Sequence, residues 1–190
     1  MIEDIANGST KDLSYLAGEH VIMWPYARGV YPPDTLYRLW KAFHGSGMVD
    51  LAFYGSLAGP ERAVPHDLEE MVSYLSSTVL LIAQSKEHDE IAGAFWFSGV
   101  SIGAQAAGNC FYLRKFWGDP AREATRIAFN YGFEELDLQQ IWGFSPWMTA
   151  IKHAVSCGAE QVATLPDFIR IKGVNRAIHV CRITREKGYG

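Results

Sequence analysis

Apolar positions along the chain follow two different periods, and each period predicts a different kind of element. Short apolar runs bounded by glycine, proline or charged residues predict strands. These runs cover residues 20–24, 78–84, 91–98, 109–115, 140–144, 161–165 and 177–184. Longer segments with apolar residues every three or four positions predict helices over about 35–43, 66–76, 121–134 and 147–157. Residues 99–108 and 166–175 are expected to be loops, because they are rich in small or turn-forming residues.

The order of these elements predicts a single mixed α/β domain over residues 1–190, with helices on the faces of one sheet. Residues 1–18 are expected to form a loosely docked lead-in. The least regular part is 45–65, which mixes glycine and proline with Leu51, Phe53 and Tyr54. Two interpretations stay open for it: a loop that binds a ligand, or a loop that packs its own hydrophobic side chains.

A strand, a tight turn and a helix over residues 109–129 form the stretch around which the chain is organised. Gly118 permits a sharp turn, Asp119 is expected to be the helix N-cap, and Pro120 suits the first helical position. A helix N-terminus attracts anions, and Arg114, Lys115 and Arg122 add positive charge beside it. The turn therefore predicts an anion site, although an ordinary strand-to-helix turn with solvated basic residues stays open.

Composition narrows the function. The net charge is −4, with 17 basic and 21 acidic residues, which argues against general nucleic-acid binding. Three scattered cysteines in apolar segments are typical of reduced thiols in a cytosolic protein, so a cytoplasmic location is expected. No signal-peptide pattern, bilayer-spanning apolar run or paired metal-ligand spacing occurs, so neither a membrane nor a metal is expected. No cysteine lies beside a suitable histidine in the pattern, so cysteine chemistry is not expected.

Residues 123–166, EATRIAFNYGFEELDLQQIWGFSPWMTAIKHAVSCGAEQVATLP, resemble the GNAT superfamily of acyl-CoA-dependent N-acetyltransferases, in particular the branch that acetylates protein N-termini. Residues 182–186 resemble its usual last strand, and the resemblance covers about residues 19–186. A similarity to acetyltransferase-like proteins of phages and prophages is weaker. The resemblance implies a mostly antiparallel central sheet of about seven strands, flanked by four helices. Its fourth and fifth strands, here 109–115 and 140–144, are expected to splay apart.

The resemblance also implies acetyl-CoA as cosubstrate, with its pyrophosphate at the turn and its pantetheine arm paired to the backbone of 111–113. The implied cofactor-binding residues are Phe111, Tyr112, Leu113, Arg114, Lys115, Trp117, Gly118, Asp119, Ala121, Arg122 and Trp147. Asp119 and Pro120 depart from the family pattern, which has a basic or small residue and then glycine there. Because Pro120 has no N–H, we expect binding to depend more on the arginines, including Arg126.

The implied chemistry is direct transfer of an acetyl group to a primary amine, either a protein N-terminus or a small amine. The family's usual asparagine aligns with Trp147, and its usual thiolate donors align with Ala150 or Ala154. The candidate catalytic residues are therefore the nearby polar side chains Ser145, Thr149 and His153. We expect catalysis to rest mainly on positioning, and an ordinary helix-face role for His153 stays open, as does an ion pair of Glu123 with Arg126.

The acceptor is expected to enter over 45–65 and 166–175 and to contact Tyr54, Trp147 and Phe168. Two other classes remain open: a catalytically silent acyl-CoA-binding or interaction protein with this fold, and an unrelated α/β scaffold. The sequence does not identify the acceptor or the oligomeric state, and a homodimer is one alternative.

Overall fold

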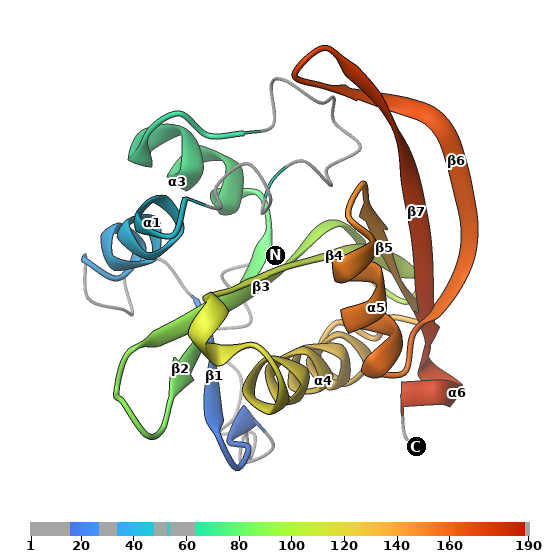
Figure 1. Cartoon of the computed structure of the whole chain (residues 1–190). Helices are drawn as coiled ribbons and strands as arrows, with labels where there is room; N and C mark the ends of the chain where they lie inside the picture. Colours follow the sequence, from blue (N-terminus) through green and yellow to red (C-terminus); the bar gives the residue numbers. More distant parts are fainter. Residues whose placement is uncertain (1–15, 27–33, 48–52, 54–63, 189–190) are drawn as a thin grey trace.

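The computed structural model describes residues 16–26, 34–47, 53 and 64–188. Seven strands form one sheet in the order β1-β2-β3-β4-β5-β7-β6, and every neighbouring pair is antiparallel except β4 and β5, which are parallel. The strands are β1 (Val21–Pro25), β2 (Val79–Ser85), β3 (Ile91–Ser101), β4 (Gln105–Tyr112), β5 (Gln140–Ser145), β6 (Glu160–Ile171) and β7 (Val174–Thr184). The helices are α1 (Thr35–Gly45), α3 (Leu68–Ser76), a 3₁₀ turn η3 (Arg114–Phe116), α4 (Asp119–Glu134), α5 (Met148–Ser156) and α6 (Arg185–Gly188). The predicted fold class is thus confirmed (Figure 1).

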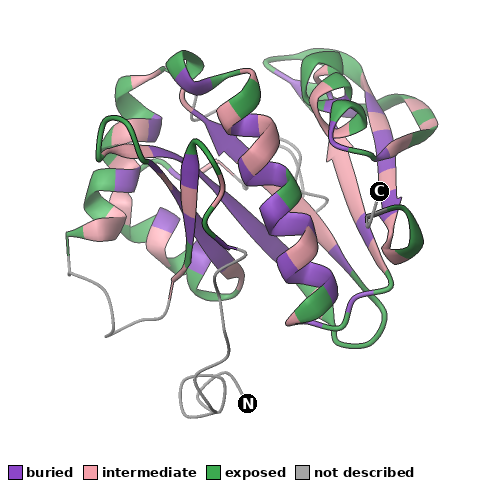
Figure 2. Cartoon of the chain, turned by 90° about the horizontal axis from the view of Figure 1, so that it is seen from below, coloured by how far each residue is buried: buried purple, intermediate pink, exposed green. Residues whose placement is uncertain are grey.

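Helices cover both faces of the β1–β4 half of the sheet. Helices α1 and α3 lie on one face and α4 lies on the other, where its buried side packs on the purple strands (Figures 1 and 2). Phe53 is fully buried, and its ring stacks on Trp96 with centroids 5.4 Å apart. This residue of the irregular stretch therefore packs into the core, whereas Leu51 and Tyr54 lie outside the described residues.

The start of β1 is anchored to the middle of the chain through one carboxylate. Glu123 on α4 accepts backbone N–H groups from Glu19, His20 and Val21, the last two at 2.7 and 3.0 Å. The carboxylate is thus used to hold β1 on α4, and no ion pair with Arg126 is seen among the described residues. These charge-assisted hydrogen bonds satisfy backbone N–H groups that have no strand partner in the described chain to accept them.

Strands β4 and β5 pair over only three positions. Gln105 lies opposite Gln140, Ala106 opposite Ile141, and Ala107 opposite Trp142. Beyond Ala107 the two strands diverge, which leaves the remainder of each facing edge without a strand partner. Gly108 is the first residue beyond the paired positions, and a Cβ there would lie only 2.8 Å from atoms of Ile141 and Phe95, so a larger residue would not fit without a shift.

Two predicted loops are largely strand. Residues 99–101 extend β3 and 105–108 begin β4, and only a tight turn separates them. Residues 166–171 extend β6, and β7 begins at Val174. A register shift between Leu165 and Ile169 accommodates Pro166. Proline has no N–H to donate to a neighbouring strand, and an edge strand such as β6 tolerates this because its outer side has no strand partner in the described sheet. The hairpin turns at Lys172 and Gly173, both with positive φ.

Candidate active site

The diverging edges of β4 and β5 border a cleft with a cavity volume of about 90 Å³. Helices α4 and α5 close it from one side, and most lining groups are apolar. The lining residues used below are Gly108, Asn109 and Cys110 of β4, Thr125 of α4, Trp142, Phe144 and Ser145 of β5, and His153 of α5. The resemblance placed a cosubstrate between these two strands, and the structure provides a cleft there.

The backbone of β4 alternates between its strand partner and the cleft. Leu113 donates its N–H to Ala92 of β3 at 2.9 Å, and Phe111 lies opposite Ala94 in the same ladder. Leu113 and Phe111 therefore direct their N–H and C=O groups toward β3. The alternate residues, Cys110 and Tyr112, direct theirs toward the cleft. Of the three positions expected to pair with a pantetheine arm, only Tyr112 has this orientation. Cys110 joins it, which the sequence did not indicate.

One of these cleft-side carbonyls already has a donor from the same chain. The Trp117 indole N–H bonds the Tyr112 carbonyl at 2.9 Å. The Arg114 guanidinium lies over the same indole, 5.6 Å from the ring centroid. Trp117 is half exposed. The indole thus links the end of β4 to the turn before α4 and fixes where Arg114 lies.

The N-terminus of α4 is built differently from the prediction. Gly118, with φ of 104°, is the N-cap, and Asp119 is the first helical residue. Only glycine adopts this φ without strain, so the turn is completed one residue earlier than expected. The Asp119 carboxylate does not cap the helix but forms an ion pair with Arg122. The first-turn N–H groups therefore keep no side-chain acceptor, as an anion site requires.

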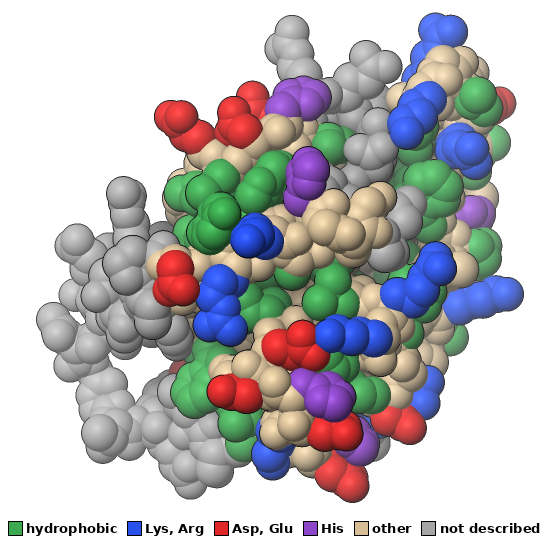
Figure 3. Space-filling view, turned by 60° about the vertical axis from the view of Figure 1, so that its left-hand side comes forward, with side chains coloured by type: hydrophobic (Ala, Val, Ile, Leu, Met, Phe, Trp, Pro, Cys, Tyr) green, Lys and Arg blue, Asp and Glu red, His purple; other side chains and the backbone are tan. Residues whose placement is uncertain are grey.

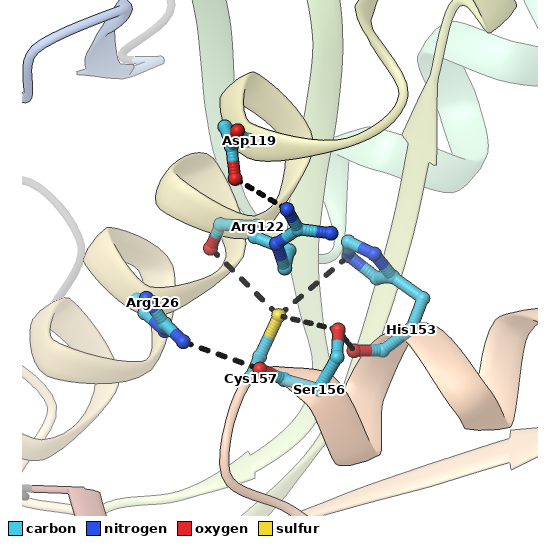
Figure 4. A network of polar contacts seen from close by, with 6 residues as sticks. All are labelled: Asp119, Arg122, Arg126, His153, Ser156 and Cys157. Carbon is cyan, nitrogen blue, oxygen red and sulfur yellow. Dashed lines mark hydrogen bonds and ion pairs between the residues drawn. The ribbon is translucent and has the colours of Figure 1, made fainter.

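The basic residues of this turn are not equivalent. Lys115 pairs with Glu90 at 2.6 Å and is thus directed toward the end of the β2–β3 hairpin. Arg126 donates to the Ser156 carbonyl at 3.2 Å, which joins α4 to the end of α5. Ala121 is buried in the core. Arg114 and Arg122 remain as the cations beside the N-cap, and Figure 4 shows Arg122 between Asp119 and His153.

A chain of hydroxyl groups leads from β4 to the histidine of α5. The Tyr112 hydroxyl lies 3.0 Å from Thr125 Oγ1, which lies 2.8 Å from His153 Nε2. Thr125 is one of the few fully buried polar residues. Burial, and secondarily the charge of Arg122, lowers the pKa of His153 below its usual 6.5. The imidazole is therefore neutral at pH 7.

The sequence offered one signal for this network. Thr125 lies four residues after Ala121 and so falls on the apolar face of the predicted helix, where a hydroxyl needs a partner. Nothing local indicated that the partners would be Tyr112 and His153.

A cysteine does lie beside a histidine, contrary to expectation. Cys157 Sγ is 3.9 Å from His153 Nε2 and 3.7 Å from the Arg122 carbonyl (Figure 4). The two residues are four apart on α5, so the helix brings them together. Burial raises the pKa of the Cys157 thiol, which disfavours a reactive thiolate. All three cysteines of the chain are free thiols.

The other candidate residues are dispersed. Ser145 is buried at the end of β5, where its Oγ accepts the N–H of Trp147 at 3.1 Å. Thr149 is exposed and does not line the cleft. Trp147 precedes α5, and its buried indole N–H has no hydrogen-bond partner in the part of the chain that the structure describes. Phe168 is 55% exposed on β6, not in a loop.

In the part of the chain that the structure describes, no three His, Cys, Asp or Glu side chains are placed to hold a metal ion. None of the described helices combines the length and the apolar character that crossing a membrane requires.

Comparisons with known proteins bear on the fold. No protein-family model matches the sequence, and no curated protein matches it. A spermidine N-acetyltransferase from Vibrio cholerae, solved with CoA and spermine, superposes with a TM-score of 0.67 at 12% identity, covering 91% of this chain and 100% of that one. For a ribosomal-protein-S5-alanine acetyltransferase from Vibrio fischeri the TM-score is 0.66 at 11% identity, with 90% and 96% covered. For a probable GNAT-family acetyltransferase from Chromobacterium violaceum the values are 0.67 and 18%, with 92% and 88% covered. The chain therefore has the fold of the GNAT acetyltransferases.

Proposed function

We propose that the protein is an acyl-CoA-dependent N-acetyltransferase that moves the acetyl group of acetyl-CoA directly to a primary amine within a ternary complex. One observation carries this proposal: the parallel β4–β5 pair opens after three residue pairs into a cleft. One wall of the cleft is the β4 edge beyond Ala107, which has no strand partner among the described residues, and the other carries Ser145 and His153. A free strand edge can pair with an extended ligand arm through its N–H and C=O groups.

The cofactor end of the site supports an anionic ligand. The first turn of α4 lacks a side-chain cap, and Arg114 and Arg122 lie beside it. A pyrophosphate there would compete with Asp119 for the Arg122 guanidinium. Arg114 could bind it while keeping its cation–π contact with Trp117. Cys110 and Tyr112 direct their backbone groups into the cleft between this turn and the acetyl group.

The reacting end needs a proton acceptor, because the attacking amine must lose a proton. His153 is neutral, lines the cleft and has a hydroxyl partner in Thr125. We assign it the proton released by the amine nitrogen as the new N–C bond forms. The imidazolium then gives that proton to the CoA thiolate as the C–S bond breaks, so protons and charge balance. A backbone N–H of the β4 edge would stabilise the oxyanion.

Cosubstrate binding is the first test. Acetyl-CoA at one hundred times its Kd should stabilise the folded protein by about 2.7 kcal/mol, which a thermal shift detects. Arg114→Ala combined with Arg122→Ala should weaken binding at least tenfold, about 1.4 kcal/mol, in calorimetry. Lys115→Ala is the matched control and should leave the affinity unchanged, because Lys115 is paired with Glu90. Unchanged affinity in the double variant would refute this placement of the pyrophosphate.

A second candidate is a silent acyl-CoA-binding or interaction protein. The Asp119–Pro120 turn, and alanines at 150 and 154 where the family's donors align, favour it. The two candidates differ in turnover on a panel of peptides and small amines. Tight acetyl-CoA binding without turnover on any acceptor would support the silent protein and refute the enzyme.

A further inference from the structure

A row of aromatic side chains covers the face of β5 that is turned away from α5. Trp142 and Phe144 stack with centroids 6.5 Å apart and an interplanar angle of 18°, and Trp147 follows them along the chain. Isoleucine and valine side chains of β6 and β7 pack against this row. We call these residues the aromatic face: Trp142, Phe144, Trp147, Ile169, Ile171, Ile178 and Val180. Its three aromatic members are only half buried.

An arginine lies over each end of the row. The Arg182 guanidinium is 5.5 Å from the Trp142 ring centroid, and the Arg176 guanidinium is 5.3 Å from that of Trp147. Arg182 is neutralised by Glu160 at 2.7 Å. Arg176 has no carboxylate partner among the described residues, so its charge is available at the exposed side of Trp147. Arginine on an indole face is also held in place by the cation–π attraction.

The hairpin around Arg176 is basic in an acidic protein. Residues 165–178 contain Arg170, Lys172 and Arg176 but only one acid, Asp167, whereas the whole chain has a net charge of −4. In Figure 3 blue side chains gather at the upper right of the molecule, and Figure 1 places the end of the β6–β7 hairpin at the top. The electrostatic potential on this side therefore favours negative groups.

The aromatic face is continuous with the cleft. Trp142 and Phe144 line the cleft, and the backbone N–H of Trp147 is bonded to Ser145, which also lines it. An acceptor whose amine reaches the cleft would thus place the groups next to that amine on Trp147 and near Arg176.

We propose that the acceptor is a peptide N-terminus that carries a carboxylate side chain within its first few residues. This rests on the proposed function and names its substrate class. The aromatic face accepts the apolar part of the peptide, and Arg176 pairs with the carboxylate. A polyamine carries several positive charges, and Arg176 repels them at the same position.

The test compares acetylation of peptides that share length and first residue but carry Glu, Gln or Lys at positions two and three, with spermidine as a fourth acceptor. The Glu peptide should exceed the Gln peptide at least tenfold in kcat/KM, mainly through a lower KM, and the Lys peptide and spermidine should rank last. Arg176→Glu should reverse the order of the Glu and Lys peptides, and Arg176→Gln should abolish the preference.

Arg170→Glu is the matched control. Ile169 lies opposite Arg176 in the β6–β7 ladder and shares its face, so neighbouring Arg170 lies on the other face of the hairpin. The same change of charge there should alter the Glu-to-Gln ratio less than threefold, because salt screens the longer separation. The thermal midpoint of each variant shows whether it folds.

Peptide binding to the CoA-saturated protein, measured by calorimetry, makes the outcome independent of turnover. A tenfold tighter Glu peptide that loses this advantage in Arg176→Gln supports the inference even if no peptide is acetylated, in which case the proposed activity fails alone. Equal binding and equal kcat/KM for the Glu and Gln peptides would overturn the inference, while acetylation of both would leave the proposed function standing.

Discussion

The β1–β4 and β5–β7 halves of the sheet differ in how far their two faces are covered. Strands β1 to β4 are antiparallel with helices on both faces, and large side chains of β3 such as Trp96 and Phe97 are fully buried. Strands β5 to β7 have α5 on one face, and the other carries the half-buried aromatic face. The first half resembles a closed core, whereas the second leaves apolar and charged groups at its surface. Most large buried side chains of the sheet therefore lie in β1–β4, and the half-buried aromatic face lies in β5–β7.

Helix α4 joins the two halves in addition to the β4–β5 pairing. Only three residue pairs join β4 to β5, but α4 packs on β1, β2, β3, β5 and α5. Glu123 of this helix holds β1, and Thr125, two residues later, reaches His153. Strands β4 and β5 can therefore diverge at the cleft while α4 holds the two halves of the sheet together.

The largest expected effect breaks the closed half. An Ala Cβ at Gly93 would lie 2.1 Å from the Phe111 carbonyl oxygen, so the β4 backbone would have to move. We expect Gly93→Ala to lower the free energy of unfolding by about 3 kcal/mol, measured by urea denaturation. Gly45→Ala, where nothing lies within 4 Å, should change it by less than about 0.5 kcal/mol. Similar values for both variants would contradict this account of β3–β4 packing.

The next effect removes an anchor of the same half. Glu123→Ala leaves the backbone N–H groups of Glu19, His20 and Val21, at the start of β1, without their charged acceptor. We expect a loss of about 2 kcal/mol, because one carboxylate accepts all three bonds. Glu69→Ala, an exposed glutamate in the first turn of α3, serves as the control and should cost less than about 0.5 kcal/mol. Hydrogen exchange of the β1 amides should rise in Glu123→Ala and stay unchanged in the control.

Local pattern predicted a strand at each of the seven strand positions, but it misplaced strand ends in both halves. The strand, turn and helix of 109–129 follow from hydrophobic period and from Gly118. The start of β4 was missed because Ala106, Ala107 and Gly108 are small, and their backbone pairing with β3 and β5 places them in a strand. Pro166 and Gly173 suggested a loop, yet the edge position of β6 and a register shift absorb the proline.

The candidate site shows the same limit. Ser145 and His153 were identified through the resemblance and do line the cleft. The backbone groups of Cys110 and Tyr112 face the cleft because the residues between and beside them hydrogen-bond to β3. No sequence pattern reveals which residues of β4 pair with β3. The partners of Thr125 lie 13 and 28 residues away, so only the folded chain brings them together.

The third prediction concerns the α5 wall of the cleft. His153→Ala should lower kcat less than about a hundredfold, because positioning carries most of the catalysis. Thr125→Val should cost about tenfold, since it removes only the hydroxyl partner of the imidazole. Thr149→Val is the control and should have no effect, because Thr149 is exposed outside the cleft. A thousandfold loss in His153→Ala would show that a dedicated proton carrier dominates instead.

The pH profile sharpens that prediction. The pKa of His153 is lowered by burial and by Arg122, and the proposed mechanism uses the neutral imidazole as proton acceptor. Activity should therefore rise with pH through a value below 6.5, the ordinary value for histidine, and then level off. Removing the Arg122 charge should raise the pKa of His153 and so move the rise in activity toward higher pH. If the rise stays at the same pH, a group other than His153 controls it.

The smallest expected effect concerns the far edge of the open half. Glu160 on β6 accepts from Arg182 of β7 at 2.7 Å and from Lys187 of α6 at 2.5 Å. These two cations, Lys187 first, lower the pKa of Glu160 from 4.5 to about 2. A carboxylate with a depressed pKa adds stability above its unfolded pKa and loses it as the pH falls through the folded one. The contribution should thus be complete above about pH 4.5 and disappear toward pH 2.

Glu160→Gln should therefore lower the thermal midpoint slightly at pH 7, and the difference from the unmodified protein should shrink between pH 4.5 and 2. Added salt should shrink it as well, because the network is exposed and screened. Glu186→Gln, a change of the same charge at an exposed position of α6, is the matched control and should show no such pH dependence. A difference that persisted unchanged to pH 2 would mean that Glu160 stabilises the β6–β7 edge through packing and not through its charge.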